Sequence, residues 1–120
     1  MKTKTFKSEF NNKVSVSIVC DDDILYSFLE PVFEDYGFGF ADTKAKAVFI
    51  DGMKKLTKDE MKWIEAHEIA HISLGHIDER NDVDEYDADV LAHKLLSEYG
   101  YNKAAKLVSK HSIERHNKQI

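Results

Sequence analysis

Apolar residues recur along the chain at two different spacings, and these spacings predict its secondary structure. Val14, Val16 and Ile18 alternate with serines, the period of two that is typical of a half-buried strand. Other segments repeat their apolar residues every three or four positions, which is typical of helices. The predicted elements are strands at 13–19, 38–41 and 45–50, and helices at 24–32, 57–75, 82–100 and 102–111. We therefore expect an α+β fold in which a small sheet of two to three strands packs on a central helix.

Residues that begin and end helices stand at the boundaries of these segments. Thr57 and Glu60 form a capping box, in which each side chain accepts from the backbone N–H of the other residue. Gly75 suits the end of the same helix, which apolar residues surround, so we expect it to be central and buried. Pro31 lacks a backbone N–H and is expected to kink or end the 24–32 helix.

The length and composition fit a single domain over residues 1–120. The chain has 120 residues, of which 42% are hydrophobic, enough to bury one modest core. No window approaches the run of about eighteen apolar residues that marks a membrane span, so no membrane association is expected. The single cysteine, Cys20, excludes an internal disulfide, and no signal peptide is visible. These features predict a cytoplasmic protein, and a protein encoded by a phage or mobile element would share them.

Charge is unevenly distributed along the chain. The formal net charge is −5, but residues 1–13 and 102–120 are both net basic, so the body between them is strongly acidic. Acid is densest in residues 78–89, a kind of run that is ordinarily a solvated loop. The few basic residues at the two ends are weak evidence for nucleic-acid binding, because the protein as a whole is acidic. We therefore expect no direct nucleic-acid binding.

A cluster of chemically active residues lies on the predicted central helix. His67 and His71 are four residues apart, so they share one helix face and are close enough to bind one metal ion. Glu68 is rotated by roughly 100° from His67, so it can reach a metal-bound water without binding the metal itself. This is the HExxH arrangement of zinc peptidases.

A catalytic zinc site needs a third protein ligand, and the acidic helix that follows offers one. Glu85 is the best candidate, and it shares a helix face with Asp89 and His93 because the three follow at four-residue spacing. If that helix began elsewhere, an acidic neighbour would replace Glu85: Asp82, Asp84 or Asp87.

Other polar residues have expected roles around the metal. Asp89 would accept the ring N–H of a ligand histidine and fix its tautomer, with a solvated carboxylate as the alternative. His76 lies past the helix end and off the face of the two motif histidines, so we expect it to interact with the helix dipole rather than bind metal. The donor that stabilises the oxyanion is expected among four residues: His93, Tyr86, Tyr99 and Tyr101.

These residues resemble the gluzincin metallopeptidases. The pattern His67-Glu68-x-x-His71-x-x-Leu74-Gly75-His76, followed by Glu85-x-x-Ala88-Asp89, is most similar to the ImmA/IrrE family. The HtpX-like and CAAX-prenyl-protease group and the minigluzincins are the second choice. The resemblance covers residues 57–100, and the ImmA/IrrE pattern usually has asparagine where this chain has Asp89.

The resemblance implies a zincin-like endopeptidase with one Zn²⁺ per chain, bound by His67, His71 and Glu85. It also implies a polypeptide substrate, which in the ImmA/IrrE family is a repressor-type, DNA-binding transcription regulator. Glu68 would be catalytic, taking the proton of the metal-bound water and passing it to the leaving amine.

Zincins also align the substrate along an edge strand above the metal. Ala47, Val48 and Phe49 occupy that place in the sequence order and are the expected substrate-binding residues, with an ordinary core strand as the alternative. Two rival functions stay open at this point. One is a metal-binding regulatory protein of zincin fold without turnover, and the other is a small interaction domain without metal.

Overall fold

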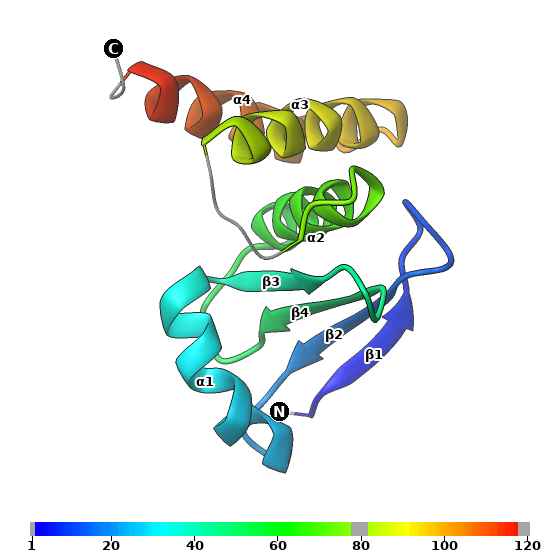
Figure 1. The fold of residues 1–120 in the computed structure, drawn as a ribbon, viewed down its shortest axis with the longest axis vertical. Coiled ribbons are helices and arrows are strands. Elements are labelled where there is room, and N and C mark those ends of the chain that lie inside the picture. Colours follow the sequence, from blue (N-terminus) through cyan, green and yellow to red (C-terminus); the bar gives the residue numbers. More distant parts are fainter. Residues whose placement is uncertain (1, 78–81, 118–120) are drawn as a thin grey trace.

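A four-stranded mixed sheet and four helices make up the part of the chain that the structure describes, which confirms the α+β prediction (Figure 1). The computed structural model describes the backbone of residues 2–77 and 82–117, and the side chains of residues 2–77 and 82–110. The elements are β1 (Lys4–Lys7), β2 (Ser15–Val19), α1 (Ile24–Tyr36), β3 (Gly39–Asp42), β4 (Ala47–Asp51), α2 (Lys58–Ser73), α3 (Asp82–Glu98) and α4 (Asn102–Asn117). No described helix is both long and apolar enough to cross a bilayer.

The sheet has the strand order β1-β2-β4-β3. The two inner strands, β2 and β4, pair in parallel, with Val16 opposite Val48. The two outer strands pair antiparallel with their neighbours, β1 with β2 and β3 with β4. Because parallel neighbours need a crossover, α1 and β3 lie between β2 and β4 in the sequence.

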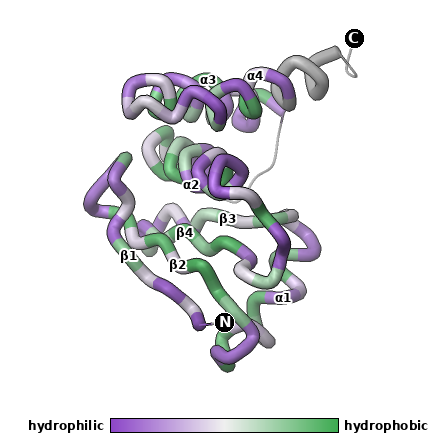
Figure 2. The backbone as a smooth tube through the Cα atoms, turned by 180° about the vertical axis from the view of Figure 1, so that it is seen from behind, coloured by the Kyte–Doolittle hydropathy of each residue, from purple (hydrophilic) through white to green (hydrophobic). Residues whose placement is uncertain are grey.

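β1 is absent from the sequence-based prediction, and its composition explains why. All four residues of Lys4–Lys7 are exposed, so the strand has no buried face and no alternation of apolar residues. Figure 2 shows the contrast between the largely hydrophilic β1 and the hydrophobic β2. Pairing with β2, including a hydrogen bond between the Thr5 and Ser17 hydroxyls, holds it in place.

One hydrophobic core joins the sheet to α2, α3 and α4. Val16, Val48 and Ile50 on the inner strands are buried against α2, whose Ile69 is fully buried. On the other side of α2, small residues of α3 and α4 let the helices approach closely: Ala88, Ala92, Ala104 and Ala105. Figure 1 shows the resulting layers, with α2 between the sheet and the α3–α4 pair. The prediction of a central, buried helix is therefore confirmed.

The boundaries of α2 follow the local signals in the sequence. Thr57 is the N-cap, and both hydrogen bonds of the capping box with Glu60 are present. At the other end, Gly75 has a left-handed φ of 71°. The backbone N–H groups of Gly75 and His76 donate to the carbonyls of Ile72 and His71, which satisfies the end of the helix. This turn brings the segment after α2 back beside the last turn of the helix.

The prediction for α1 is partly wrong, because the helix does not end at Pro31. It continues to Tyr36 and ends at Gly37, whose φ is 92° and whose N–H donates to the carbonyl of Phe33. Ring contacts of Phe33 and Tyr36 with Phe40 of β3 hold this last part of the helix on the sheet. These contacts offset the hydrogen bond that a proline removes from a helix.

Candidate metal centre

The side-by-side packing of α2 and α3 brings together the three residues that the sequence predicts as metal ligands. His67 and His71 project from α2, and Glu85 projects from the first turn of α3. The Nε2 atoms of the two histidines lie 3.1 Å apart. Glu85 Oε2 is 3.2 Å from His67 Nε2, and Glu85 Oε1 is 3.1 Å from His71 Nε2.

These separations fit one small tetrahedral ion. Zinc lies about 2.0–2.1 Å from histidine nitrogens and carboxylate oxygens, so two ligand atoms of a tetrahedral site are roughly 3.3 Å apart. The two histidine nitrogens are within a few tenths of an ångström of that value, and each of them has one of the two Glu85 oxygens at a similar distance. One ligand atom from each of the three residues lies within 4.8 Å of the other two. Two imidazoles and one carboxylate also leave a fourth position for water, as catalytic zinc sites do. Geometry and ligand chemistry therefore both fit Zn²⁺ at His67, His71 and Glu85.

The alternative acidic ligands do not join this cluster. Asp82 and Asp87 are exposed on α3. Asp84 lies nearer the site, but its carboxylate is 3.4 Å from His76 Nε2. Within the described residues, the group that meets the geometry of a metal site is His67, His71 and Glu85. Residues 78–81, the start of the acidic run, lie outside the described part of the chain.

Asp89 lies where the sequence predicts, against the ring of His67. Its Oδ1 is 2.9 Å from His67 Nδ1, and the aspartate is 2% exposed. When His67 Nε2 directs its lone pair to a metal, the Nδ1–H donates to this carboxylate and fixes the tautomer. The buried contact replaces the alternative of a solvated helix carboxylate.

His76 contacts His71, which the sequence analysis does not anticipate. The two Nδ1 atoms are 2.9 Å apart, and His76 Nε2 in turn faces Asp84. With His71 Nε2 turned to a metal, its Nδ1–H donates to His76, whose own Nε2–H faces the Asp84 carboxylate. The helix-ending turn at Gly75 produces this contact because it returns the chain toward the last turn of α2.

We predict that His76→Ala lowers zinc affinity by about 10–100-fold, the usual effect of removing a residue that orients a metal ligand. His71 would keep its place on α2 but lose the partner that fixes its ring. The measurement is competition for zinc with a chromogenic chelator. The exposed residue Leu74 supplies the matched control, Leu74→Ala, and equal zinc affinity in both variants would contradict the prediction.

Glu68 lies beside the three ligand atoms without being one of them. Its Oε1 is 4.0 Å from His67 Nε2, and the residue is 8% exposed. It lines a cavity of about 230 Å³ together with His67 and Glu85. Tyr36 and Trp63 line the same cavity and were not singled out from the sequence. Trp63 precedes His67 by one helical turn, a spacing that signals a shared face, whereas the sequence carries no such signal for Tyr36.

The structure does not bring His93 to the ligand cluster or to the cavity beside Glu68. The histidine is exposed on α3. The four-residue spacing drifts by about 40° per step, so His93 is rotated by about 80° from Glu85. The predicted tyrosines are also elsewhere: Tyr86 and Tyr99 are exposed, and Tyr101 donates to Glu9.

The expected substrate strand is also wrong. Ala47, Val48 and Phe49 belong to β4, which pairs with β2 on one side and β3 on the other. An inner strand has no unpaired backbone groups, so it cannot add a peptide strand. The open edge nearest the cluster belongs to β3, whose Gly39 lines the cavity with His67 and Glu68. A side chain at Gly39 would meet Ile64 of α2 at 2.9 Å, so the glycine allows this close approach.

Burial, hydrogen bonds and neighbouring charges shift the pKa values of two ligand residues, His67 and Glu85, in the metal-free protein. Burial lowers the pKa of His67, but hydrogen bonds to Asp89 and Glu85 and the charge of Glu68 outweigh it and raise the pKa to about 10. Burial raises the pKa of Glu85, but hydrogen bonds to His67 and His71 outweigh it and hold the pKa well below its usual value of 4.5. Protonated His67 therefore supplies in part the positive charge that a metal would bring.

We predict that the metal-free protein is most stable between about pH 4.5 and 6.5. The raised pKa of His67 contributes stability that is complete below its unfolded value of 6.5 and is lost as the pH rises through about 10. The lowered pKa of Glu85 contributes stability that is present above 4.5 and is lost at lower pH. Urea unfolding of chelator-treated protein across pH tests this, and stability that rises from pH 6.5 to 10 contradicts it.

Comparisons of the chain with models of protein families, with curated proteins and with solved structures find no match. What the geometry defines is an α+β fold with a candidate His-His-Glu metal centre between two helices.

Proposed function

We propose that the protein is a zinc-dependent endopeptidase. The observation that carries the proposal is the mutual spacing of the His67, His71 and Glu85 ligand atoms, with Glu68 beside them. A non-catalytic metal site has no need of a carboxylate in the position of Glu68. The resemblance of the motif to the ImmA/IrrE family supports the same reaction and a repressor-type transcription regulator as substrate. The unpaired Cys20 supports a cytoplasmic location.

Each residue of the site would have a separate role in peptide-bond hydrolysis. Bound zinc would lower the pKa of a water molecule toward neutrality and polarise the scissile carbonyl. Glu68 takes the proton of the attacking water and gives it to the leaving amine. Asp89 and His76 hold the rings of His67 and His71 in the tautomers that leave Nε2 free to bind metal. Tyr36 carries a hydroxyl donor, lines the same cavity and replaces His93 as the candidate for oxyanion stabilisation.

The open edge of β3 supplies the backbone groups for aligning a substrate. The N–H of Asp51 donates to the carbonyl of Phe38, so Phe38 is a hydrogen-bonded partner in the antiparallel pair. Hydrogen-bonded residues alternate in such a pair, so the backbone groups of Gly39 and Ala41 face away from β4. An extended peptide paired with these two residues would pass the cavity that contains Glu68.

The test is zinc-dependent cleavage of an unfolded protein such as reduced casein, followed by mass spectrometry. We expect internal peptide bonds to be cut, the cleavage to stop with 1,10-phenanthroline, and stoichiometric zinc to restore it. Cleavage that is indifferent to the chelator, or protein that binds zinc but cuts nothing, contradicts the proposal. The second of these outcomes would favour a metal-binding regulatory protein without turnover.

A further inference from the structure

α1 presents an apolar stripe to solvent instead of burying it. Ile24 and Phe28 are 80% and 68% exposed, although the amphipathic pattern predicts a helix face packed on the sheet. Phe33 is the buried residue of this helix, so the side facing the sheet is narrow. Val32 follows Phe28 by four residues and is half-buried, and Ile24 precedes Phe28 by four. The stripe Ile24, Phe28 and Val32 therefore winds by about 40° per step around α1, from the exposed start of the helix to its half-buried end.

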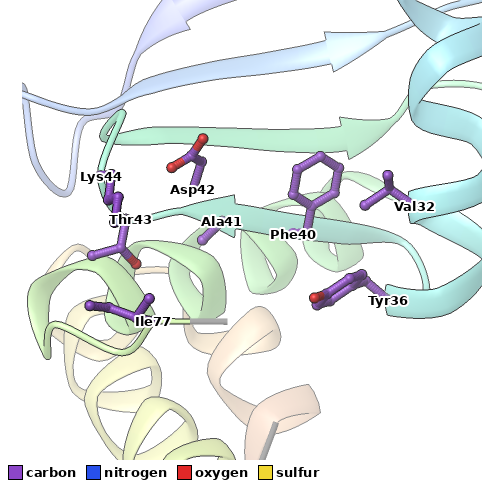
Figure 3. Close-up of a pocket in the computed structure, with 8 residues that line it drawn as sticks. All are labelled: Val32, Tyr36, Phe40, Ala41, Asp42, Thr43, Lys44 and Ile77. Atoms are coloured by element: carbon purple, nitrogen blue, oxygen red, sulfur yellow. The ribbon is translucent and has the colours of Figure 1, made fainter. Parts of the chain in front are cut away.

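The stripe leads into a cavity beside the open edge of β3. This cavity has a volume of about 310 Å³, and Figure 3 shows Val32, Tyr36 and Phe40 at one end and Ile77 at the other. Ile77 is 59% exposed and follows the turn at the end of α2. The volume is enough for a large apolar side chain from a bound polypeptide.

The cavity adjoins the candidate active site. Tyr36 lines both this cavity and the one that contains Glu68 and His67. Ala41, one of the two β3 residues with outward-facing backbone groups, also lines it. A peptide strand paired with Gly39 and Ala41 of β3 would therefore pass both cavities, and Val32 connects the second cavity to the stripe on α1.

The charge around the stripe is predominantly negative, although Lys44 lines the far end of the adjoining cavity. The helix and the turn before it carry six carboxylates and no lysine or arginine: Asp21, Asp22, Asp23, Glu30, Glu34 and Asp35. All but Asp23 are exposed. Such a rim attracts a partner whose apolar residues are flanked by basic ones and repels an acidic partner.

We propose that Ile24, Phe28, Val32 and the adjoining cavity form a docking surface for a polypeptide segment with apolar residues flanked by lysine or arginine. The proposal rests on the proposed function in one respect, that this segment belongs to the substrate. The exposed apolar residues would bind apolar side chains of this segment, and the surrounding carboxylates would attract its lysine or arginine residues. The docking surface then selects substrates at a distance from the scissile bond.

Binding of three matched, fluorescently labelled peptides tests this, measured by anisotropy with full-length, zinc-loaded Glu68→Gln protein. One peptide has an apolar centre with lysine flanks, one has the same centre with glutamate flanks, and one has a serine centre with lysine flanks. We expect the first to bind at least about tenfold more tightly than the others. Phe28→Ser and Ile77→Ser each remove that preference, whereas Val90→Ser, at a site 53% exposed on α3, keeps it.

Equal binding of the three peptides overturns the proposal, and so does an equal loss in the Phe28→Ser and Val90→Ser variants. Incubating the same peptides with wild-type protein separates the two proposals. Selective binding without cleavage leaves the docking surface standing and rejects the protease. Cleavage of all three peptides without selective binding supports the protease and rejects the docking surface.

Discussion

Replacing Glu68 by glutamine is expected to lower the cleavage rate by about 10²–10⁴-fold, the range that a general base contributes. Glutamine is nearly isosteric with glutamate but does not take a proton from water. Because Glu68 is not among the three ligand residues, the variant should bind zinc as tightly as the wild type. The measurements are the rate of casein cleavage and the zinc affinity of the same preparations.

Glu98→Gln is the matched control, because Glu98 is exposed near the end of α3. It should cleave at the wild-type rate. Unchanged cleavage in Glu68→Gln would contradict the role of Glu68 as the base. Loss of zinc together with loss of cleavage would place Glu68 among the ligands instead.

Replacing Glu85 by glutamine is expected to lower zinc affinity by more than about 100-fold. Removal of a group that only orients a ligand costs about 10–100-fold, and Glu85 supplies one of the three ligand atoms itself. The amide also removes the negative charge that offsets the charge of zinc. Competition with a chelator gives the affinity, and cleavage at saturating zinc gives the activity.

Asp87→Asn tests whether any acid of this helix would serve. Asp87 is two residues from Glu85 and exposed, so its variant should bind zinc like the wild type. An equal affinity in the Glu85→Gln and Asp87→Asn variants would show that the third ligand comes from elsewhere. A larger loss in Asp87→Asn would assign it to the neighbouring acid.

Features encoded within one helix could be predicted from the sequence. The capping box and Gly75 define α2, and a fixed helical spacing places His67 and His71 on one face. Glu85 and Asp89 could also be identified, since the start of α3 is marked by acidic residues and their spacing matches one turn. The contact between His71 and His76 could not, because it depends on how the chain turns after the helix.

Features that depend on pairing between distant segments were missed. The apolar residues of β4 predict a strand, but its inner place follows from parallel pairing with β2, which no local pattern encodes. The edge strand is β3 instead. Its residues Gly39 and Ala41 have little or no side chain, so the sequence pattern does not indicate that their backbone could align a substrate. Pro31 misled the prediction because the aromatic contacts that extend α1 come from the sheet.

The most direct test of the account is the zinc content and zinc coordination of protein purified without added metal. Elemental analysis should find one zinc per chain, and X-ray absorption should find two imidazole nitrogens, a carboxylate and a water at about 2.0–2.1 Å. A zinc content near zero that added zinc does not raise would contradict the account, and so would a bound zinc whose ligands are not His67, His71 and Glu85.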